Sequence, residues 1–499
     1  MSLLPLDPQL IAAIILCITA LAVIHKHAQR PNDLPPGPRG HWLFGNVLPN
    51  SFAYRKFEEW TKEFGPVFSL RQGTRTIIVV GRVQAAMDIM EKEGAFLVDR
   101  PASIAAGETL SGGMRVLLTP AGERFKKLRR ALHTHLQPKA VTTYSPVLMR
   151  NARNHILDLI DDPSNHQDHA KRYSASVVMA LAYGRHPEGY NDPGVQAVNR
   201  CLTRLGLNLR PGLWKVDIYP FLRYIPGYLR ELQDGHQEEL ALFKGQLATV
   251  REKMERDDAS YCFGRYLLER QAELELDDNE VAYLAGALFG AGSDTTASAI
   301  SITVMAAALH PEAQAKVQEE LDSVIGSDRP PTMEDANMLP QTTAFVLETF
   351  RWRPVTAGGF AHKATKDIIW NNYRIPKGAT VMGNIWAISR DPVVYPEPET
   401  FNPQRWLTED GKLRTDMRTF SWGSGRRVCP GQYIAHSSVF LNAALMHWAF
   451  KISANPSSPI DSLAFTESAN THPLPFKVAF EPRTMDLVTL RSMFEMYGQ

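Results

Sequence analysis

The sequence predicts a mainly α-helical domain with a small β lobe, a fold of the α+β class. Residues 277–310 form one long apolar stretch that a core helix would explain, and several shorter segments have a helical pattern. Residues 67–80 and 367–388 alternate in the way that short strands do. The length alone would suggest about three domains, but no linker divides the chain.

The composition is that of a globular protein with a large core. Apolar residues make up 44% of the chain and charged residues 21%, and the net charge is +1. A balance so close to neutral gives no electrostatic reason to expect nucleic acid as a partner. Four cysteines without a CxxC spacing favour neither a zinc site nor a disulfide framework, which fits a reducing compartment such as the cytosol.

The N-terminus carries an apolar run from Leu10 to Ile24, with basic residues such as Lys26 and Arg30 directly after it. The run of 15 residues is shorter than the ~20 of a full span. A cleaved signal peptide is the alternative, but its basic residues would precede the run and a small-residue cleavage site would follow. We therefore expect residues 1–30 to be a membrane anchor, with the rest of the chain on the cytosolic side.

Residues 31–40 contain Leu34–Pro38, which reads Leu-Pro-Pro-Gly-Pro. Such a stiff, non-helical segment predicts a hinge between the anchor and a single domain over residues 41–499.

The first part of that domain predicts a mixture of strands and helices. Residues 67–80 predict two short strands, and residues 83–94 predict a helix. Residues 101–120, rich in Gly, Ala and Ser, predict a loop. Residues 124–136 predict a basic helix with a solvated face, and the proline-rich residues 211–230 predict an irregular segment that touches a membrane or closes a pocket.

The stretch over residues 277–310 predicts one long helix. Asp277 and Glu280 suit its N-terminus, and no lysine or arginine occurs from Val281 to Leu309. A transmembrane helix is the alternative, but Asp294 and neighbouring hydroxyls would be costly in a bilayer. A helix through the core explains the same facts, and its glycines would thin it where a flat group packs: Gly286, Gly290 and Gly292.

Residues 339–353 predict another helix, with Glu348 and Arg351 on one face. Such a pair usually lies on the surface, but the aromatic flanks here indicate a buried one. Short strands are expected over residues 367–388, and Arg405 follows in an aromatic setting.

Cys429 is the residue with the clearest chemical signature. A single cysteine is most often a small buried hydrophobe. Here Arg427 precedes it by two residues and glycines surround it, which would favour a thiolate and allow a flat macrocycle to approach the backbone. The glycines are Gly423, Gly425 and Gly431. Haem iron is the metal that best explains a buried thiolate in this setting.

Glycine pairs at residues 290–292 and 423–425 lack the third glycine of a dinucleotide-binding loop, and no Walker sequence occurs. We therefore expect no flavin or nicotinamide site, and reducing power from a partner protein.

These segments, in this order, resemble the cytochrome P-450 family of haem-thiolate monooxygenases, from the proline-rich segment to the C-terminus. The segments around Cys429 and over residues 291–296 carry the resemblance. Residues 173–176 (Tyr-Ser-Ala-Ser) and 181–184 (Leu-Ala-Tyr-Gly) are similar to fungal members, many of which serve secondary metabolism.

The resemblance implies a role for each matching residue. Cys429 would be the axial ligand of haem b, and Asp294 and Thr295 would deliver protons to bound dioxygen. The partners of the haem propionates would be Arg427, His362 and Arg129. A buried structural triad would consist of Glu348, Arg351 and Arg405.

Two residues depart from the family pattern. Trp422 stands where the family usually has Phe, and it would keep an aromatic wall beside the iron while altering hydrogen bonding and redox potential. Phe125 stands where the family usually has Trp, so an indole N–H that would reach a propionate is lost.

The resemblance implies an enzyme that inserts one atom of O₂ into an apolar metabolite, such as a terpenoid or polyketide. NADPH–cytochrome P-450 reductase would supply electrons, with cytochrome b5 as a further donor, at the endoplasmic reticulum membrane. The pocket would be lined by residues 102–118, 283–295, 355–361 and part of 466–475, with an apolar floor around residues 355–360. An oxygen-independent isomerase or dehydratase and a haem sensor are the alternatives, and the Asp294–Thr295 pair argues against both.

Overall fold

The computed structural model describes residues 7, 9, 14–19, 32–42, 44–49, 51–187, 192–210, 212–258, 260–483 and 486–498. Most of the predicted anchor, residues 1–30, lies outside these ranges. Within them, no helix combines the length and apolarity needed to cross a bilayer.

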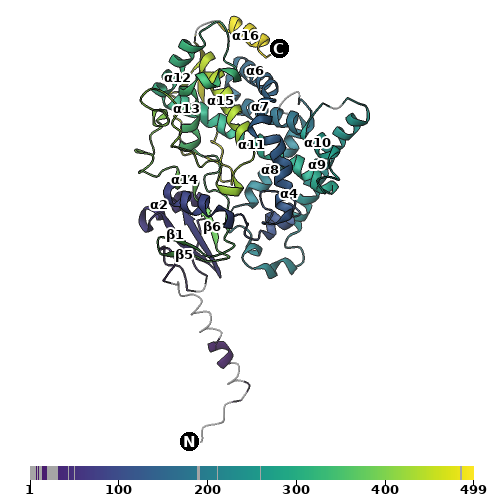
Figure 1. Ribbon diagram of the computed structural model, residues 1–499, viewed down its shortest axis with the longest axis vertical. Coiled ribbons are helices and arrows are strands. Elements are labelled where there is room, and N and C mark those ends of the chain that lie inside the picture. The colour runs from purple at the N-terminus through teal and green to yellow at the C-terminus, as the bar shows by residue number, and fades with distance from the viewer. Residues whose placement is uncertain are drawn as a thin grey trace.

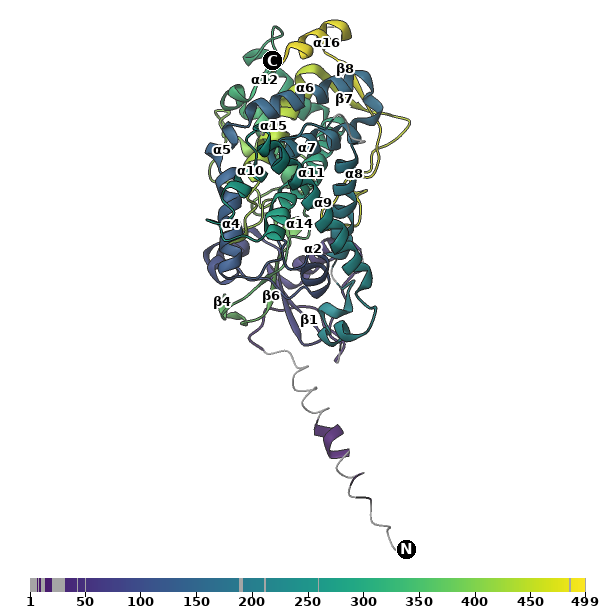
Figure 2. The same cartoon turned by 90° about the vertical axis from the view of Figure 1, so that its right-hand side faces the viewer.

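Helices form most of the structure, which confirms the mainly α-helical class (Figures 1 and 2). The described α-helices of the first part of the chain are α2 (Ala53–Phe64), α3 (Val83–Ala85), α4 (Glu123–Leu136), α5 (Pro138–Thr142), α6 (Ser145–Asp161), α7 (His166–Tyr183), α8 (Pro193–Asn208), α9 (Arg230–Glu255) and α10 (Phe263–Glu269). Those that follow are α11 (Asp278–Leu309), α12 (Pro311–Val324), α13 (Pro340–Trp352), α14 (Ile385–Ile388), α15 (Gln432–Ala449) and α16 (Leu487–Met496).

Short 3₁₀ and π segments connect them: η1 (Ala86–Lys92), η2 (Gly94–Phe96), η3 (Ile104–Leu110), η4 (Pro163–Asn165), η5 (Lys215–Asp217), η6 (Pro220–Tyr224), η7 (Met333–Met338), η8 (Pro403–Trp406) and η9 (Gly425–Arg427).

The β lobe is small and lies at the end of the molecule where the chain enters the domain (Figure 1). Its four-stranded sheet has the order β1-β2-β6-β3, in which β2 and β6 are parallel and the other pairs antiparallel. The strands are β1 (Val67–Gln72), β2 (Arg75–Val80), β3 (His362–Lys363) and β6 (Thr380–Gly383). The pair β4 (Ile368–Trp370) with β5 (Tyr373–Ile375) lies in the same lobe, whereas β7 (Phe450–Ala454) pairs with β8 (Val478–Pro482) at the opposite end of the molecule, near α16 (Figure 2).

The Pro-rich segment packs against this sheet. The backbone N–H of Ser69 in β1 donates to the carbonyl of Pro36 at 2.8 Å, and the Ser69 hydroxyl donates to that of Pro35 at 2.9 Å. A Cβ on Gly37 would lie 2.1 Å from the Ser69 carbonyl oxygen, so only glycine fits there. The predicted hinge is non-helical as expected, but from Pro35 onward it is part of the domain.

Helix α11 runs through the centre of the molecule, between α7, α9, α13 and α15 (Figure 1). Asp277 and Glu280 form a capping box at its start, with side chain and backbone N–H bonded in both directions. With 32 residues it is about 48 Å long. The prediction of a long core helix is therefore confirmed.

The glycines of α11 have a different role from the one expected. A Cβ on Gly286 would strike the ring of Phe243 in α9 at 2.4 Å, and one on Gly292 would strike Val178 of α7 at the same distance. A Cβ on Gly290 would lie 2.8 Å from Leu202 in α8. These glycines let three neighbouring helices approach, and the packing of a flat group on α11 remains a prediction.

Three other local predictions need correction. The segment over residues 101–120 is not a plain loop, because it contains the π-helical turn η3, which Ser103 caps by accepting from the N–H of Gly107. Residues 385–388, expected to be strand, form the short helix α14. The helix expected over residues 83–94 is mostly π-helical.

Glu348 holds helix α13 to the segment after α14. Its carboxylate accepts from Arg351 at 2.7 and 2.8 Å, from Arg405 at 3.1 Å, from the indole of Trp406 at 2.9 Å and from the backbone N–H of Asn402 at 2.9 Å. Glu348 and Arg351 have no exposed side-chain surface, and 7% of Arg405 is exposed. The two arginines and the carboxylate thus lie together in the interior.

Replacement of Glu348 by Gln would leave two buried guanidinium groups without a counter-charge. We expect Glu348→Gln to lower the free energy of unfolding by about 3–5 kcal/mol, measured by urea denaturation. Glu269→Gln is the matched control, because Glu269 pairs with Arg265 on the surface of α10, and its cost should be about 0.5 kcal/mol or less. Equal effects of the two substitutions would contradict the structural role of Glu348.

Candidate functional site

Cys429 lies between the short helix η9 and the start of α15. Its backbone N–H donates to the carbonyl of Trp422 at 2.8 Å, which closes a turn over residues 422–429. Gly423 and Gly425 have φ angles of 76° and 57°, a conformation that side chains strain. The sequence around Cys429 therefore folds into a tight loop that presents the thiol just before a helix N-terminus.

Backbone conformation and packing explain why two of the three positions near Cys429, 423 and 425, are glycines. Besides its positive φ, Gly425 approaches residues 90–94 so closely that a Cβ would lie 2.8 Å from the carbonyl oxygen of Met90. Gly431 has a φ of −86° and open space around its Cα. The approach of a flat group to this glycine remains a prediction.

Burial raises the pKa of the Cys429 thiol. The backbone N–H groups of Gly431 and Gln432 and the charge of Arg129 act in the opposite direction and do not outweigh burial. The cation that acts on the sulfur is thus Arg129, whereas the sequence pointed to Arg427. A thiol in this setting becomes a thiolate when a metal ion replaces its proton.

A cluster of four nitrogen-bearing side chains lies near Cys429: Arg100, Arg129, His362 and Arg427. They come from four separate parts of the chain, and backbone carbonyls accept from each of them. Arg427 donates to Val98, Val116 and Thr119. Arg100 donates to Leu117 and Ala361, Arg129 to Val428, and Nδ1 of His362 to Leu97.

The charges of this cluster repel one another in a buried setting. Burial and the charge of Arg427 lower the pKa of Arg100 to about 9. Burial likewise lowers the pKa of Arg427 to about 10, where Arg129 adds repulsion and Asp99 opposes it. Burial and the charge of Arg100 lower the pKa of His362 to about 3, so its imidazole is neutral at neutral pH.

These features fit a ligand with carboxylates at one edge, such as haem with its two propionates. Asp99 is the carboxylate that acts on Arg100 and Arg427 among the described residues, and it also pairs with Lys363 at 3.4 Å. A ligand carboxylate would compensate the remaining positive charge. Because Nδ1 of His362 donates to a carbonyl, its Nε2 carries a proton only when the ring is charged.

Phe125 in α4 contacts this cluster directly. The guanidinium carbon of Arg427 lies 3.5 Å from the centre of the Phe125 ring, a cation–π contact. The substitution that the sequence pointed out thus removes an indole N–H but retains an aromatic face against Arg427. Trp422, the other departure, packs edge-to-face on Phe350 of α13 with ring centres 4.8 Å apart.

Asp294 and Thr295 lie near the middle of α11, and their polar groups point in different directions. The Thr295 hydroxyl donates to the carbonyl of Ala291 in its own helix at 2.7 Å. The Asp294 carboxylate accepts from Nε2 of His472 at 2.8 Å and from the amide of Asn470 at 3.0 Å. Among the described contacts, none joins Asp294 to Thr295 directly, so the predicted pair shares a helix but no hydrogen bond.

Burial raises the pKa of Asp294, but the hydrogen bond and charge of His472, the hydrogen bond of Asn470 and the charge of Lys171 outweigh it. The pKa therefore lies below its usual value, and the carboxylate is ionised at neutral pH.

The expected apolar floor over residues 355–360 is only partly as predicted. Ala357 packs with Tyr54 and Trp386, and Gly359 approaches Gly383 so closely that a Cβ would lie 2.2 Å from its carbonyl oxygen. Both residues thus pack against the β lobe and α14. Val355 instead accepts from the backbone N–H of Thr471 at 2.8 Å, which ties the floor to the 466–472 segment.

Three residues of the site were missed by the sequence reasoning: Arg100, Asn470 and His472. Arg100 lies one residue before the segment expected to be a loop, and no spacing relates it to Arg427. His472 and Asn470 fall in the predicted pocket segment, but a single histidine or asparagine in an irregular stretch has no pattern that separates it from a structural residue.

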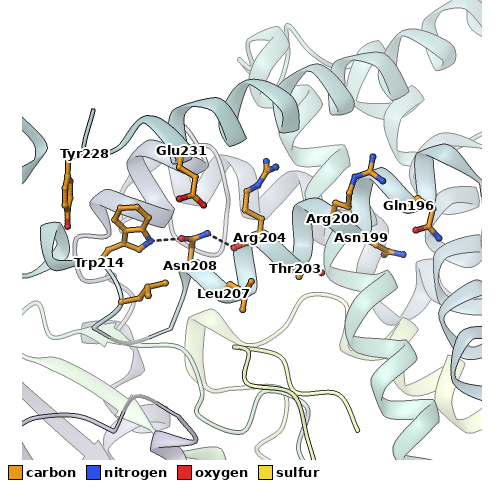
Figure 3. A pocket seen from close by; sticks show the side chains of 11 residues that line it. Gln196, Asn199, Arg200, Thr203, Arg204, Leu207, Asn208, Trp214, Tyr228 and Glu231 are labelled. Carbon is orange, nitrogen blue, oxygen red and sulfur yellow. Dashed lines mark hydrogen bonds between the residues drawn. The ribbon is translucent and has the colours of Figure 1, made fainter. Parts of the chain in front are cut away.

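A surface pocket of about 820 Å³ lies apart from these residues, along α8 and the start of α9 (Figure 3). Trp214 closes one end, where its indole donates to Asn208 at 2.6 Å and its ring meets Tyr228 edge-to-face. Its lining residues all come from residues 196–231, so it shares none with the predicted substrate pocket.

Comparison with known protein families shows that residues 35–480 match the family described as Cytochrome P-450. The match covers the Pro-rich segment, α11, the Glu348 cluster and Cys429.

Several similar proteins from fungi match over nearly their whole length. Cytochrome P-450 monooxygenase 88 of Postia placenta is 54% identical over 468 residues, which cover 94% of each chain. Cytochrome P-450 monooxygenase 113 of the same fungus is 53% identical, over 94% of this chain and 97% of the relative. Cytochrome P-450 monooxygenase fogE of Aspergillus ruber is 33% identical, over 95% and 91%.

Proposed function

The chain belongs to the cytochrome P-450 family, and on that premise we propose that it oxidises an apolar small metabolite, of the terpenoid or polyketide class, in fungal secondary metabolism. It is a monooxygenase, and membership of the family implies haem iron, O₂, an organic substrate and a redox partner. The proposal extends these points to the cofactor contacts, the residues that move protons, the electron donor and the membrane.

The observation that carries the proposal is the partly buried cluster of Arg100, Arg129 and Arg427 beside Cys429, with an excess of positive charge. His362 lies within this cluster as a neutral imidazole. The cluster supports haem b, which the cationic side chains would hold at its propionates and Cys429 would hold at its iron. Trp422, Phe125 and the glycines 423, 425 and 431 would surround it. When bound, the haem supplies the activation of O₂. The protein binds and orients it, and the Glu348–Arg351–Arg405 triad keeps the surrounding segments in place.

Asp294 and Thr295 are proposed to move protons on the opposite side of the site. The ionised Asp294 carboxylate can take up a proton and release it, and the Thr295 hydroxyl can pass one on when it turns away from Ala291. A water molecule between the two side chains would complete this path, because the described contacts do not join them directly.

The electron donor is proposed to be NADPH–cytochrome P-450 reductase, with cytochrome b5 as a second donor. Helix α4 supports this, because Arg129 reaches the carbonyl of Val428 next to the cysteine while Lys126 and Arg130 of the same helix are exposed. A positive surface close to the thiolate would steer an acidic electron-transfer protein. No flavin or nicotinamide site of its own is proposed for the chain.

The membrane is proposed to be that of the endoplasmic reticulum, with the N-terminal segment as a single anchor and the domain on the cytosolic side. Large apolar side chains are exposed in two segments far apart in sequence: Trp42, Phe44 and Val47, and Leu207, Leu213, Tyr219, Phe221, Tyr224 and Ile225. Both segments contact the β1–β2 turn. The backbone N–H of Gly73 donates to the Phe44 carbonyl, and a Cβ placed on Gly73 would lie 3.6 Å from the side chain of Ile218. One exposed apolar surface near the point of chain entry favours contact with lipid.

The ligand assignment predicts a thiolate spectrum. Reduced protein with carbon monoxide should give the red-shifted Soret band of haem-thiolate ligation, and Cys429→Ser should abolish it. Cys262→Ser is the matched control, because Cys262 is a buried thiol at the N-cap of α10, and it should keep the band. Product formed with NADPH and the reductase then separates a monooxygenase from an isomerase or a sensor. If the wild-type protein lacks the band, the role of Cys429 is wrong.

The proposed role of Thr295 predicts uncoupling. Thr295→Ala should lower the amount of product per NADPH consumed by about tenfold, since a hydroxyl that positions a proton is lost, with the missing electrons recovered as hydrogen peroxide. Ser301→Ala removes a similar hydroxyl that bonds to its own helix at 2.9 Å and should leave the ratio unchanged. Equal ratios in Thr295→Ala and the wild type would refute the role.

The membrane surface predicts protection from protease. With the full-length protein on phospholipid vesicles, tryptic cleavage after Arg223 should slow by about tenfold relative to detergent solution, since apolar burial holds this segment in the interface. Cleavage after Lys412, whose side chain is 81% exposed, provides the internal control. The double change Phe221→Asp and Tyr224→Asp should remove the protection. Cleavage after Arg223 that is as fast on vesicles as in detergent would contradict the proposal.

A further inference from the structure

The Asp294 carboxylate is fully engaged by one segment of the chain. One oxygen accepts from Nε2 of His472 at 2.8 Å and the other from the amide of Asn470 at 3.0 Å. His472 is therefore the titratable group in direct contact with the carboxylate to which a proton-moving role is assigned above. No spacing rule in the sequence connects the two residues, which are 178 positions apart.

The segment that carries His472 is held in place on three sides. His472 exchanges two hydrogen bonds with Thr466, at 2.8 and 3.0 Å, which closes a turn. Thr471 donates through its backbone N–H to Val355 at 2.8 Å and accepts at its carbonyl from the hydroxyl of Ser298 in α11 at 2.7 Å. These bonds fix the backbone of this segment relative to α11, and thereby place the imidazole next to Asp294.

The pair is neither sealed nor fully solvated. The side chain of His472 is 24% exposed and that of Asp294 is 27% exposed. A partly exposed imidazole can exchange its proton with water, and it changes charge near neutral pH more readily than any other side chain. A carboxylate held ionised by its partners, in contrast, needs a source for each proton that it passes on.

From this geometry we infer that His472 is the positioning residue and proton donor of Asp294, the entry point through which protons reach the oxygen-binding side of the site. This inference rests on the proposed role of Asp294 and names the group that supplies it. In each cycle the proton on Nε2 of His472 moves to the carboxylate oxygen of Asp294, which passes it toward Thr295. The neutral imidazole then regains a proton from solvent.

The protons balance with the reaction of the family. One oxygen atom of O₂ enters the substrate and the other leaves as water, with two electrons from the redox partner and two protons from solvent. The His472–Asp294 pair delivers both protons, one after the other, and ends the cycle in the state in which it began. No further oxidant or reductant is needed.

Other titratable groups also face this region. Lys171 of α7 acts on Asp294 through its charge, and its ammonium pairs with Asp168 at 2.8 Å. His166, at the start of α7, bonds to the carbonyl of Phe476 at 3.1 Å beyond the His472 segment. Their charges add to the field at Asp294, but among the described contacts only His472 can donate a titratable proton to it directly.

The test compares His472→Gln with Asn470→Ala in the complete enzyme with its reductase. His472→Gln retains a side-chain amide but cannot cycle a proton, so the product per NADPH at neutral pH should fall roughly tenfold, less than the 10²–10⁴ of a direct general acid. The wild-type ratio should fall as the pH rises from about 6 to about 9, the range in which a proton supply that depends on a histidine is lost. His472→Gln should remain low and flat across this range, whereas Asn470→Ala should keep the wild-type pH dependence.

A histidine for which no contact with Asp294 is described provides the control for the loss of an imidazole. His169 of α7 is half-buried and bonds through Nε2 to the carbonyl of Asp162 at 2.8 Å. His169→Gln should match the wild type in both the ratio and its pH profile. A purely structural role of His472 would lower the ratio equally at all pH values and leave the slope of the profile unchanged.

A second measurement does not depend on turnover. In histidine-labelled protein in the reduced, CO-bound and therefore diamagnetic state, the NMR signal that disappears in His472→Gln belongs to His472. This signal should change its chemical shift in Asp294→Asn, because the hydrogen bond from Nε2 to the charged carboxylate is lost. The signals of His169 should not move.

The outcomes distinguish the role of Asp294 from that of His472. If Asp294→Asn keeps the wild-type ratio of product to NADPH, the proposed role of Asp294 fails. If Asp294→Asn uncouples the enzyme while His472→Gln has the ratio and pH profile of the wild type, the role of Asp294 stands and that of His472 is overturned. A His472 signal with the same chemical shift in Asp294→Asn and the wild type would also overturn it.

Discussion

The buried carboxylate of Glu348 is the contact on which the arrangement of the site depends. It accepts hydrogen bonds from α13, from the segment around Asn402 and from Arg405 and Trp406, so it joins parts of the chain that no regular element connects. Such a charge is costly to bury and is tolerated only because each of its oxygens is satisfied. The segment that leads to Cys429 is joined to the same helix, because the Ser421 hydroxyl donates to the carbonyl of Phe350, next to Arg351 in α13.

The site itself is built on the opposite electrostatic principle. Around Glu348 each charge meets its partner within the protein, whereas the cations near Cys429 donate mainly to carbonyls, which leave their net charge in place. Burial therefore lowers the pKa of Arg100 and Arg427. The cluster around Glu348 is complete without a ligand and stabilises the fold, while the cluster near Cys429 would gain a counter-charge if an anionic cofactor bound there as proposed. On that proposal, this difference would separate structural from cofactor-binding arginines in one chain.

Much of this could be predicted from the sequence, because the long helix, the first two strands and the burial of Glu348 depend on local patterns and apolar flanks. The glycines of α11 could not be interpreted, since only the packing partners Phe243, Leu202 and Val178 reveal what each one accommodates. Arg100 and His472 belong to the site through contacts between distant segments. The prediction that Arg427 is the cation acting on the Cys429 sulfur was wrong for the same reason. The orientation of its guanidinium is set by the carbonyls of residues 98, 116 and 119.

The packing of the Pro-rich segment on β1 has a mechanical consequence. Pro35 and Pro36 accept hydrogen bonds from Ser69, and Gly37 packs too closely on β1 to carry a side chain. A force on the chain before Leu34 is therefore transmitted directly to the sheet. The roughly ten residues between Ile24 and Leu34 reach at most about 35 Å when fully extended. In a domain attached to a bilayer at Ile24, this length would be the upper limit of the distance between the lipid and the start of the β lobe. The apolar side chains beside the lobe would therefore stay close to the membrane surface.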